Sequence, residues 1–258
     1  MPNPRDTSFL NRLGLRTRAF LNSRKLIKLA TIFETDKWGP HSYARHYDHH
    51  FASIRKRPLT VLEIGVGGYD NPNAGGESLR VWKWFFPNSQ IVGIDHHPKT
   101  AIEEPRIRTF QGSQADASFL ERVVSEIGRP DIIIDDGSHL NAHVIAAFQA
   151  LFPLLKDDGI YVVEDLQTSY WPSFGGVTHP APDTPTTMNF FRGLIDGLNH
   201  SEYLDPGYEP TVYDRHMVSM HFYHNLMFIY KGLNNEGSNL VRDGRCPLED
   251  IPRSSSST

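Results

Sequence analysis

The segment Asp131–His139 reads DIIIDDGSH, and it determines the expected architecture more than any other part of this chain. Three β-branched apolar residues run directly into the pair Asp135–Asp136, as a buried strand does when it ends at a polar edge. A second apolar run, Ile160–Val163, ends in another acidic pair, Glu164–Asp165. Two such strands are expected to bring their carboxylates to one edge of a sheet. A hard divalent cation or a proton-transfer site is the usual reason to tolerate this crowding.

Strands and helices alternate on both sides of this segment. The expected strands are short apolar runs bounded by polar turns, namely 59–64, 90–95, 107–110, 131–135 and 160–164. The expected helices carry apolar residues at helical spacing, namely 77–86, 117–127 and 141–155. This alternation predicts an α/β fold, with a doubly wound, mostly parallel sheet covered by helices on both faces. Two later strand-like runs, near 212–222 and 226–231, are close enough to form a C-terminal antiparallel pair.

The chain is expected to divide into three parts. Residues 1–57 carry apolar positions at roughly helical spacing, which predicts a short N-terminal helical extension. The core, 58–235, contains a loop at 172–187 that is rich in proline, glycine and threonine. Long loops at such a place are often lids. Residues 236–258 are expected to form a C-terminal tail, whose low-complexity end at 254–258 is expected to be disordered.

The composition excludes several classes of function. The 258 residues are 39% hydrophobic and 22% charged, which suits one soluble α/β domain with elaborations. With a formal net charge of −4, the chain lacks the excess of basic residues typical of nucleic-acid-binding proteins, so nucleic acid is not an expected partner. The basic residues within 12–28 are interpreted as a solvated helix face. Cys246 is the only cysteine, which excludes an internal disulfide and a multi-thiolate zinc site. Because there is no apolar run of membrane-spanning length and no signal peptide, a cytoplasmic protein without a membrane partner is expected.

Glycines follow the first expected strand and indicate a ligand site. Gly65 and Gly67 allow a close approach of the backbone at a strand-to-helix turn, and Asp95 ends the next strand, where an acidic residue would bind a ribose. The pair predicts a nucleoside-containing cofactor; the alternative is a tight turn with an exposed aspartate. Glu63 precedes the turn, and its carboxylate would repel phosphates but suit a cationic ligand. A polar loop at 69–76 also delays the next helix, so S-adenosylmethionine is favoured over NAD.

Five long motifs, within residues 30–232, resemble those of the metal-dependent sugar O-methyltransferases of macrolide biosynthesis. In chain order they are DKWGPHSYARHY (36–47), EIGVGGYDNPNAGGESLRVWKWFFPNSQIVGID (63–95), IDDGSHLNAHV (134–144), VVEDLQTSYWPSFGG (162–176) and HFYHNLMFIYKG (221–232). The resemblance implies a class I methyltransferase (Rossmann-like) fold, S-adenosylmethionine and Mg²⁺ as cofactors, and methylation of a sugar hydroxyl.

Carried over by position, the resemblance implies that Asp136, Glu164 and Asp165 bind the metal and that His139 is the general base. All-oxygen ligands suit Mg²⁺ or Mn²⁺ better than zinc. Asp135 is expected to point to the opposite side of the extended chain from Asp136. The alternative for these carboxylates is helix capping or salt bridging.

Histidines near the acidic pairs have competing interpretations. His139 and His143 have the i, i+4 spacing of helical zinc ligands, but no glutamate follows His139, so the metalloprotease pattern fails. His221 is the second candidate for the base, whereas His143 and His224 are expected to be structural.

Further residues are expected around the two ligands. By resemblance, Ser113 and Gln114 lie where relatives bind the adenine, and both are assigned to the cofactor. Gln167 and Tyr170 follow the second acidic pair and are assigned to the acceptor. Three aromatic residues are expected to cover the same pocket from the N-terminal segment, namely Trp38, Tyr43 and Tyr47.

The expected protein is therefore an S-adenosylmethionine- and Mg²⁺-dependent O-methyltransferase. Its acceptor would be a deoxysugar, such as a rhamnose-type sugar, on a glycosylated natural product of antibiotic biosynthesis. Relatives assemble as oligomers, which implies a homo-oligomer, and some carry a large additional N-terminal domain. The acceptor pocket is accordingly expected from residues 1–57, the 172–187 loop or a neighbouring subunit. Three alternatives remain open: methylation of a catechol-like diol, an auxiliary role in antibiotic assembly, and a non-catalytic partner subunit that binds an adenosyl ligand.

Overall fold

A computed structural model describes residues 4–248, with side chains from residue 13 onward, and its centre is one seven-stranded sheet. The strands are β1 (Thr60–Ile64), β2 (Gln90–Asp95), β3 (Ile107–Gln111), β4 (Ile132–Asp135), β5 (Ile160–Val163), β6 (Met217–Tyr223) and β7 (Leu226–Lys231). They lie in the order β3-β2-β1-β4-β5-β7-β6. Strands β1 to β5 pair in parallel, and β7 runs antiparallel to both β5 and β6. The expected mostly parallel sheet with a C-terminal antiparallel pair is confirmed.

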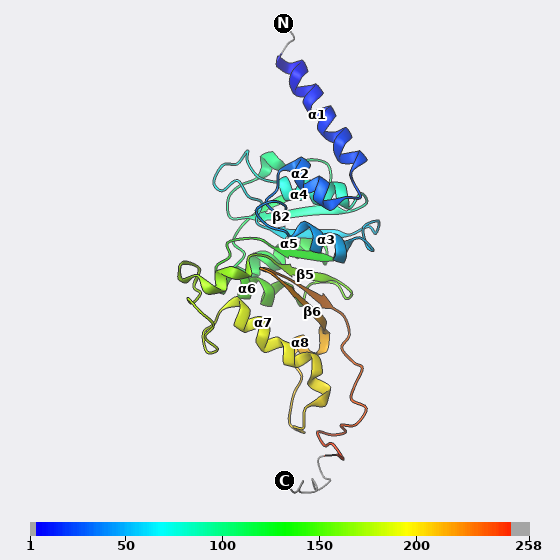
Figure 1. Ribbon diagram of the computed structural model, residues 1–258, viewed down its shortest axis with the longest axis vertical. Coiled ribbons are helices and arrows are strands. Elements are labelled where there is room, and N and C mark those ends of the chain that lie inside the picture. The colour runs from blue at the N-terminus through cyan, green and yellow to red at the C-terminus, as the bar shows by residue number, and fades with distance from the viewer. Residues whose placement is uncertain (1–3, 249–258) are drawn as a thin grey trace, which may run out of the picture.

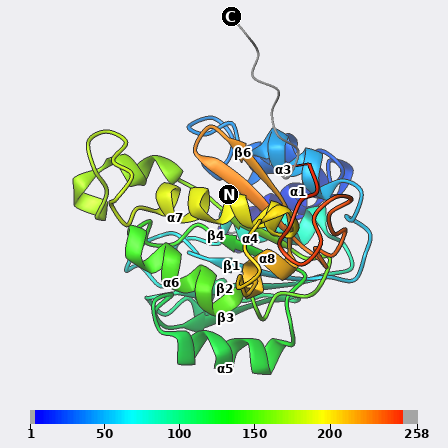
Figure 2. The same ribbon diagram turned by 90° about the horizontal axis from the view of Figure 1, so that it is seen from below.

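Helices cover both faces of the sheet, which gives three layers. The helices are α1 (Pro4–Leu21), α2 (Leu26–Phe33), α3 (Ala44–Phe51), α4 (Glu77–Phe85), α5 (Ala117–Ile127), α6 (Asn141–Leu151), α7 (Thr187–Ile195) and α8 (Val212–His216). Short 3₁₀ turns lie at Thr100–Ile102, Leu166–Tyr170, Pro172–Phe174 and Asp196–Glu202. Figure 2 shows α3 on one side of the strands and α5 and α6 on the other.

Side chains along each strand alternate between the two faces of the sheet, which gives a hydrophobic core on each face. On β1, Val61 packs with the residues of α2, α3 and α4, whereas its neighbour Leu62 packs with those of α5 and α6. Successive strand side chains point to opposite faces, so a strand buried on both sides reads as a continuous apolar run. This is why β4 and β5 are fully buried and yet end abruptly at acidic residues.

One expected strand is in part a helix. Residues 212–216 form α8, and β6 begins only at Met217. The Thr211 side chain accepts a hydrogen bond from the Asp214 backbone N–H, and the Asp214 carboxylate accepts one from the Thr211 N–H, so the two residues form a capping box. This box begins a helix in a segment whose apolar residues alone indicate a strand.

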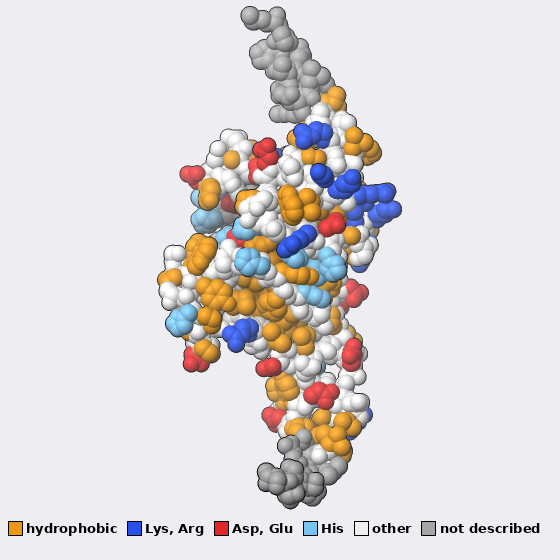
Figure 3. Space-filling model, in the orientation of Figure 1, with side chains coloured by type: hydrophobic (Ala, Val, Ile, Leu, Met, Phe, Trp, Pro, Cys, Tyr) orange, Lys and Arg blue, Asp and Glu red, His pale blue; other side chains and the backbone are white. Residues whose placement is uncertain are grey.

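The N-terminal region is helical, as expected, but its helices differ in their packing. α2 and α3 pack on α4 and the sheet, whereas α1 projects away from the body of the molecule (Figure 1). Leu13, Phe20 and Leu21 of α1 are exposed, and so are the basic residues Arg16 and Arg18. Figure 3 shows basic side chains gathered toward this end of the molecule. In the described part of the chain, no helix has both the length and the apolarity needed to cross a membrane. The expected disorder at 254–258 lies outside the described residues.

Candidate metal and cofactor site

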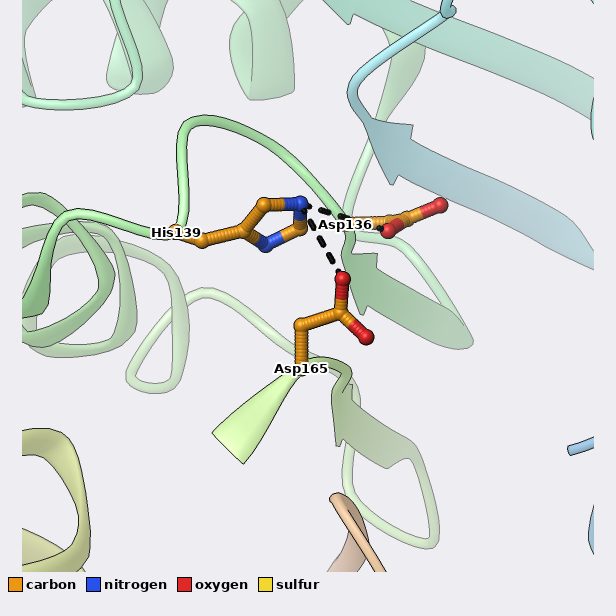
Figure 4. A group of neighbouring side chains, drawn as sticks. All are labelled: Asp136, His139 and Asp165. Atoms are coloured by element: carbon orange, nitrogen blue, oxygen red, sulfur yellow. Dashed lines mark ion pairs between the residues drawn. The ribbon is translucent and has the colours of Figure 1, made fainter. Parts of the chain in front are cut away.

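The two acidic pairs meet at the carboxyl edge of the sheet, together with His139 (Figure 4). Asp136 follows β4 and Asp165 follows β5, and their carboxylates converge on the His139 ring from two sides. His139 Nε2 lies 3.4 Å from Asp165 Oδ2 and 3.9 Å from Asp136 Oδ1. One ligand atom from each of these residues lies within 4.8 Å of the others, so the three could hold one metal ion.

Glu164 belongs to a second, more deeply buried acid group. Glu63, Asp136 and Glu164 also offer ligand atoms within 4.8 Å of one another. A lysine ammonium lies among them: Lys37 Nζ is 2.6 Å from Asp136 Oδ2, 2.6 Å from Glu164 Oε1 and 3.3 Å from Glu63 Oε1. The structure therefore divides the expected metal ligands between two groups that share Asp136. Asp165 joins His139, whereas one oxygen of Glu164 binds a lysine to which the sequence analysis assigned no role.

Two tyrosines of the N-terminal segment also bind these acids. The Tyr43 hydroxyl donates to Asp165 Oδ1 at 2.7 Å, and the Tyr47 hydroxyl donates to Glu164 Oε1. Tyr47 is fully buried, and Tyr43 is nearly so. Both were expected to cover a pocket, but they instead hold carboxylates of the acid cluster. Trp38, expected to have the same role, is partly exposed.

Burial disfavours the charged forms of the carboxyl groups in this cluster. It raises the pKa of Glu63 to about 7, and it raises the pKa of Asp136 and Glu164 as well. For Lys37, burial would lower the pKa, but the nearby carboxylates outweigh it, so its pKa is raised and the ammonium stays charged. One ammonium thus faces three neighbouring carboxylates, and Asp165 lies just beyond them.

The donor set fits a hard divalent cation. Four carboxylates against one lysine leave more acidic than basic groups in the cluster. Carboxylate oxygens are the ligands that Mg²⁺ and Mn²⁺ prefer. Asp136 Oδ1 and Asp165 Oδ2 face the more open side, where His139 lies, so a divalent ion there would relieve the excess charge.

Asp135, the neighbour of Asp136, is buried and has partners different from those of Asp136. Its Oδ1 accepts a hydrogen bond from Gln114 Nε2 at 3.1 Å, and its Oδ2 is buried without a partner. Burial raises the Asp135 pKa to about 7. Gln114 Oε1 accepts from the Ser138 backbone N–H at 2.7 Å, so this amide connects Asp135 to the loop that carries His139.

A cleft of about 900 Å³ adjoins the acid cluster. Most of its lining comes from five segments: Glu34–Asp36, Ile64–Tyr69, Ile94–His97, Gly112–Gln114 and Asp136–His139. Glu77, Ser78, His143 and Phe174 complete it. The expected cofactor residues Gly65, Gly67, Asp95, Ser113 and Gln114 all line it. Gly65 has φ +93°, and a Cβ there would lie 2.0 Å from the Asp136 carbonyl oxygen, so only glycine lets the two loops approach this closely.

Glu63 is the exception among the expected cofactor residues. Its side chain is fully buried beneath the cleft, where Oε2 accepts from Ser78 Oγ at 2.9 Å and Trp82 Nε1 at 3.0 Å. Glu63 is not among the residues that line the cleft, and its direct contact with a cationic ligand stays a prediction. Its Oε1 lies 3.3 Å from Lys37 Nζ.

Asp95 uses both carboxylate oxygens to organise the edge of the cleft. Oδ2 accepts from the Val66 N–H at 3.0 Å, and Oδ1 accepts from the His97 N–H at 2.8 Å. Lys99 fixes the neighbouring loop, because its buried ammonium donates to the carbonyls of Tyr69, Asn71 and Ala74.

Three other candidate residues, Gln167, Tyr170 and His221, are not among those that line the cleft. Neither Gln167 nor Tyr170 is among its lining residues, although Phe174 is; Tyr170 is 38% exposed. His221 lies on β6 with its ring 5.1 Å from that of His50, away from the acid cluster. The geometry thus favours His139 over His221 as the base. His143 lies at the cleft, and its Nδ1 lies 3.0 Å from Ser138 Oγ.

Several known proteins are similar to this chain in sequence and fold. No protein-family model matches the chain. It is 48% identical over 219 residues to the mycinamicin VI 2''-O-methyltransferase of Micromonospora griseorubida, which covers 83% of the chain and 55% of that protein. It is 47% identical to the demethylmacrocin O-methyltransferase of Streptomyces fradiae, over 82% of the chain and 54% of that protein. Among solved structures, MycE methyltransferase from the mycinamycin pathway, in complex with Mg and SAH, matches with a TM-score of 0.80 and 48% identity, over 83% of the chain and 55% of MycE.

The sheet order and the cleft at its carboxyl edge define a class I methyltransferase fold, which the likeness to MycE confirms. Within that class, the chain is a homologue of the sugar O-methyltransferases of macrolide and tetracenomycin pathways, and the resemblance found in its motifs is confirmed. The chain spans about half the length of the curated relatives it matches, between 54% and 57% of the first three.

Proposed function

We propose that this chain is an S-adenosylmethionine- and Mg²⁺-dependent O-methyltransferase that acts on a deoxysugar hydroxyl of a glycosylated small molecule. The observation that carries the proposal is the placement of His139 between Asp136 and Asp165 at the mouth of the cleft. A base beside two carboxylates at the wall of a cofactor-sized cleft suits transfer to a hydroxyl group. The names of the relatives support the acceptor class.

Asp136, Glu164 and Asp165 are the proposed metal ligands, and Mn²⁺ would serve in place of Mg²⁺. When bound, the ion supplies positive charge that lowers the pKa of an adjacent acceptor hydroxyl. Asp136 Oδ1, Glu164 Oε2 and Asp165 Oδ2 are the oxygens that donors of the N-terminal segment leave without a hydrogen bond in the described chain. These three oxygens are the proposed contacts.

His139 is the proposed general base. Its Nε2 lies 3.4 Å from Asp165 Oδ2, beside the proposed metal ligands, where the acceptor hydroxyl would be held. The methyl group of S-adenosylmethionine is already activated, so the contribution of the protein is chiefly alignment and exclusion of water. Gly65, Gly67, Asp95, Ser113 and Gln114 are the proposed contacts of the cofactor.

The acceptor is expected to lie next to the proposed metal ligands. Gln167 and Tyr170, which follow the Glu164–Asp165 pair, are the proposed contacts of the acceptor. We further propose a homo-oligomer with no nucleic-acid partner, consistent with the net charge of −4.

The test is methyl transfer from labelled S-adenosylmethionine to a panel of glycosylated macrolides, their aglycones and a catechol, with Mg²⁺ or with EDTA. Transfer to glycosides only, and only with the metal, is expected. Transfer to the catechol but to no glycoside would replace the proposed acceptor class. Undiminished transfer after complete metal removal would refute the metal mechanism.

A further inference from the structure

Lys37 is one of the most completely buried charged side chains in the described part of the chain. It is 1% exposed, and it lies in the turn before α3, on a segment that crosses the carboxyl edge of the sheet. Its ammonium contacts three carboxylates from three different strand ends, those of Glu63, Asp136 and Glu164. A surface ion pair contributes little, but a charge buried this deeply is tolerated only if it is compensated.

The three carboxylates form a cation position in their own right. Their oxygens lie within 4.8 Å of one another, a spacing that suits a metal ion. In the structure an ammonium occupies this position, at 2.6 Å from two of the oxygens. The group lies beneath the outer group of Asp136, His139 and Asp165, and Asp136 belongs to both.

Lys37 also determines which oxygens remain for a second cation. It binds Oδ2 of Asp136, so Oδ1 is left on the side of His139. It binds Oε1 of Glu164, so Oε2 is left without a hydrogen bond to any residue that the structure describes. The lysine thus divides each shared carboxylate into an inner and an outer oxygen.

We propose that Lys37 is a positioning residue that restricts the metal centre to one divalent ion. Its ammonium fills the inner position among Glu63, Asp136 and Glu164, and a divalent ion is confined to the outer oxygens beside His139 and Asp165. This inference rests on the proposed function, because it assumes that the outer group binds metal.

The test counts Mn²⁺ ions by equilibrium dialysis and by electron paramagnetic resonance, without any activity measurement. Wild-type protein is expected to bind one ion, with the spectrum of an isolated Mn²⁺. Lys37→Ala removes the inner cation and is expected to bind a second ion. Because both ions would share Asp136, the variant is expected to show the spectrum of an exchange-coupled pair, which loss of packing alone would not produce.

Lys99→Ala is the matched control, because Lys99 is equally buried but donates to backbone carbonyls, not to carboxylates. It is expected to keep one ion. The double variant Lys37→Ala/Glu63→Gln is expected to lose the second ion again. Lys37→Gln repeats the test with a side chain of similar length.

Three results would overturn the proposal. The first is a second strongly bound ion in the wild type, and the second is a single ion in both folded Lys37 variants. The third is failure of both variants to fold in excess Mn²⁺, because a bound Mn²⁺ ion should replace the missing ammonium. A wild type that binds no Mn²⁺ and yet transfers methyl groups would contradict the proposed metal mechanism itself, which is a different outcome.

Discussion

His139 and Asp165 share a backbone conformation that is uncommon for residues with a side chain. Their φ angles are +56° and +54°, in the left-handed region. Asparagine, aspartate and histidine enter this region more readily than other residues, and it is often found at functional sites. In both places the chain turns sharply after a strand, which directs the two side chains toward each other across the edge of the sheet.

Replacing His139 by alanine tests its role as the base. Loss of general-base catalysis is expected to lower kcat by about 10²- to 10⁴-fold, with little change in the affinity for S-adenosylmethionine. Steady-state kinetics and calorimetric titration measure the two quantities separately.

His143→Ala is the matched control, because His143 lines the same cleft but its Nδ1 faces Ser138. Its kcat is expected to stay within about 10-fold of wild type. An equal loss in both variants would remove His139 from the proposed mechanism.

Asp135 gives a prediction about the pH dependence of stability. Its pKa is raised by burial to about 7 in the folded protein, against about 3.9 in an unfolded chain. Neutral Asp135 therefore contributes stability that is complete below about pH 4 and is lost as the pH rises through about 7. Asp135→Asn removes this loss. Between about pH 5 and pH 8, the free energy of unfolding of the variant is expected to increase by about 2 kcal/mol relative to that of the wild type.

Urea unfolding in EDTA measures this gain without interference from bound metal. Asp183→Asn, in the exposed part of the 172–187 loop, is the control and should show no such dependence on pH. A difference between Asp135→Asn and wild type that stays constant across this range would contradict the raised pKa.

At the level of elements, buried lysines hold loops by binding backbone carbonyls. Lys99 donates to three carbonyls of the loop between β1 and α4, at 2.7, 2.9 and 3.2 Å. Lys231 does the same for the carbonyls of Phe152, Pro153 and Leu155, just after α6. Only the first of these loops borders the cofactor cleft.

This pair allows a matched test of the cleft loop. Lys99→Met is expected to loosen the loop and weaken S-adenosylmethionine binding by about 10-fold, since the ligand must then order the loop at a cost of about 1.4 kcal/mol. Lys231→Met is expected to lose similar stability but to bind the cofactor normally. Calorimetric titration with thermal unfolding distinguishes the two effects, and equal affinities in both variants would refute the role of Lys99.

Most elements of the sheet were predictable to within one or two residues. β2, α5 and β7 were predicted with their observed bounds, because polar or turn residues interrupt the apolar pattern on each side. The helix at residues 212–216 was not predicted, because apolar spacing in a short segment does not distinguish a strand from a helix. The capping box of Thr211 and Asp214 was a readable signal that was overlooked.

At the level of the whole molecule, the acid cluster joins segments far apart in the chain. Its carboxylates could be predicted from strand ends, because the parallel order brings those ends together. Lys37 could not be assigned, since it is 99 residues from Asp136 and 127 from Glu164, and no spacing rule reaches so far. The available signal was indirect: so many carboxylates at one edge require a cation.

Because the site draws on the whole fold, a bound ion is expected to stabilise the whole molecule. Mg²⁺ or Mn²⁺ at 100 times its dissociation constant adds about 2.7 kcal/mol to the free energy of unfolding. That corresponds to an increase in Tm of roughly 5 to 10 °C for a chain of this size. Differential scanning fluorimetry with added metal or with EDTA measures the shift.

Asp165→Asn is the control for this stabilisation, because asparagine also adopts the left-handed conformation but offers a weaker ligand. It is expected to lose most of the shift. A wild-type Tm that does not respond to either metal would contradict the proposed ligands.

The contact between Lys37 and the strand ends also has a consequence for biosynthesis. A ribosome makes the lysine long before it makes Asp136 and Glu164, and domains tend to fold as units once enough of the chain has emerged. Until β5 is complete, Glu63 and Asp136 are the carboxylates available to the ammonium, and its contact with Glu164 cannot form. A nascent chain that stops before Asp165 is thus expected to lack part of the proposed ligand set, and so to be unable to hold an ion in the native way.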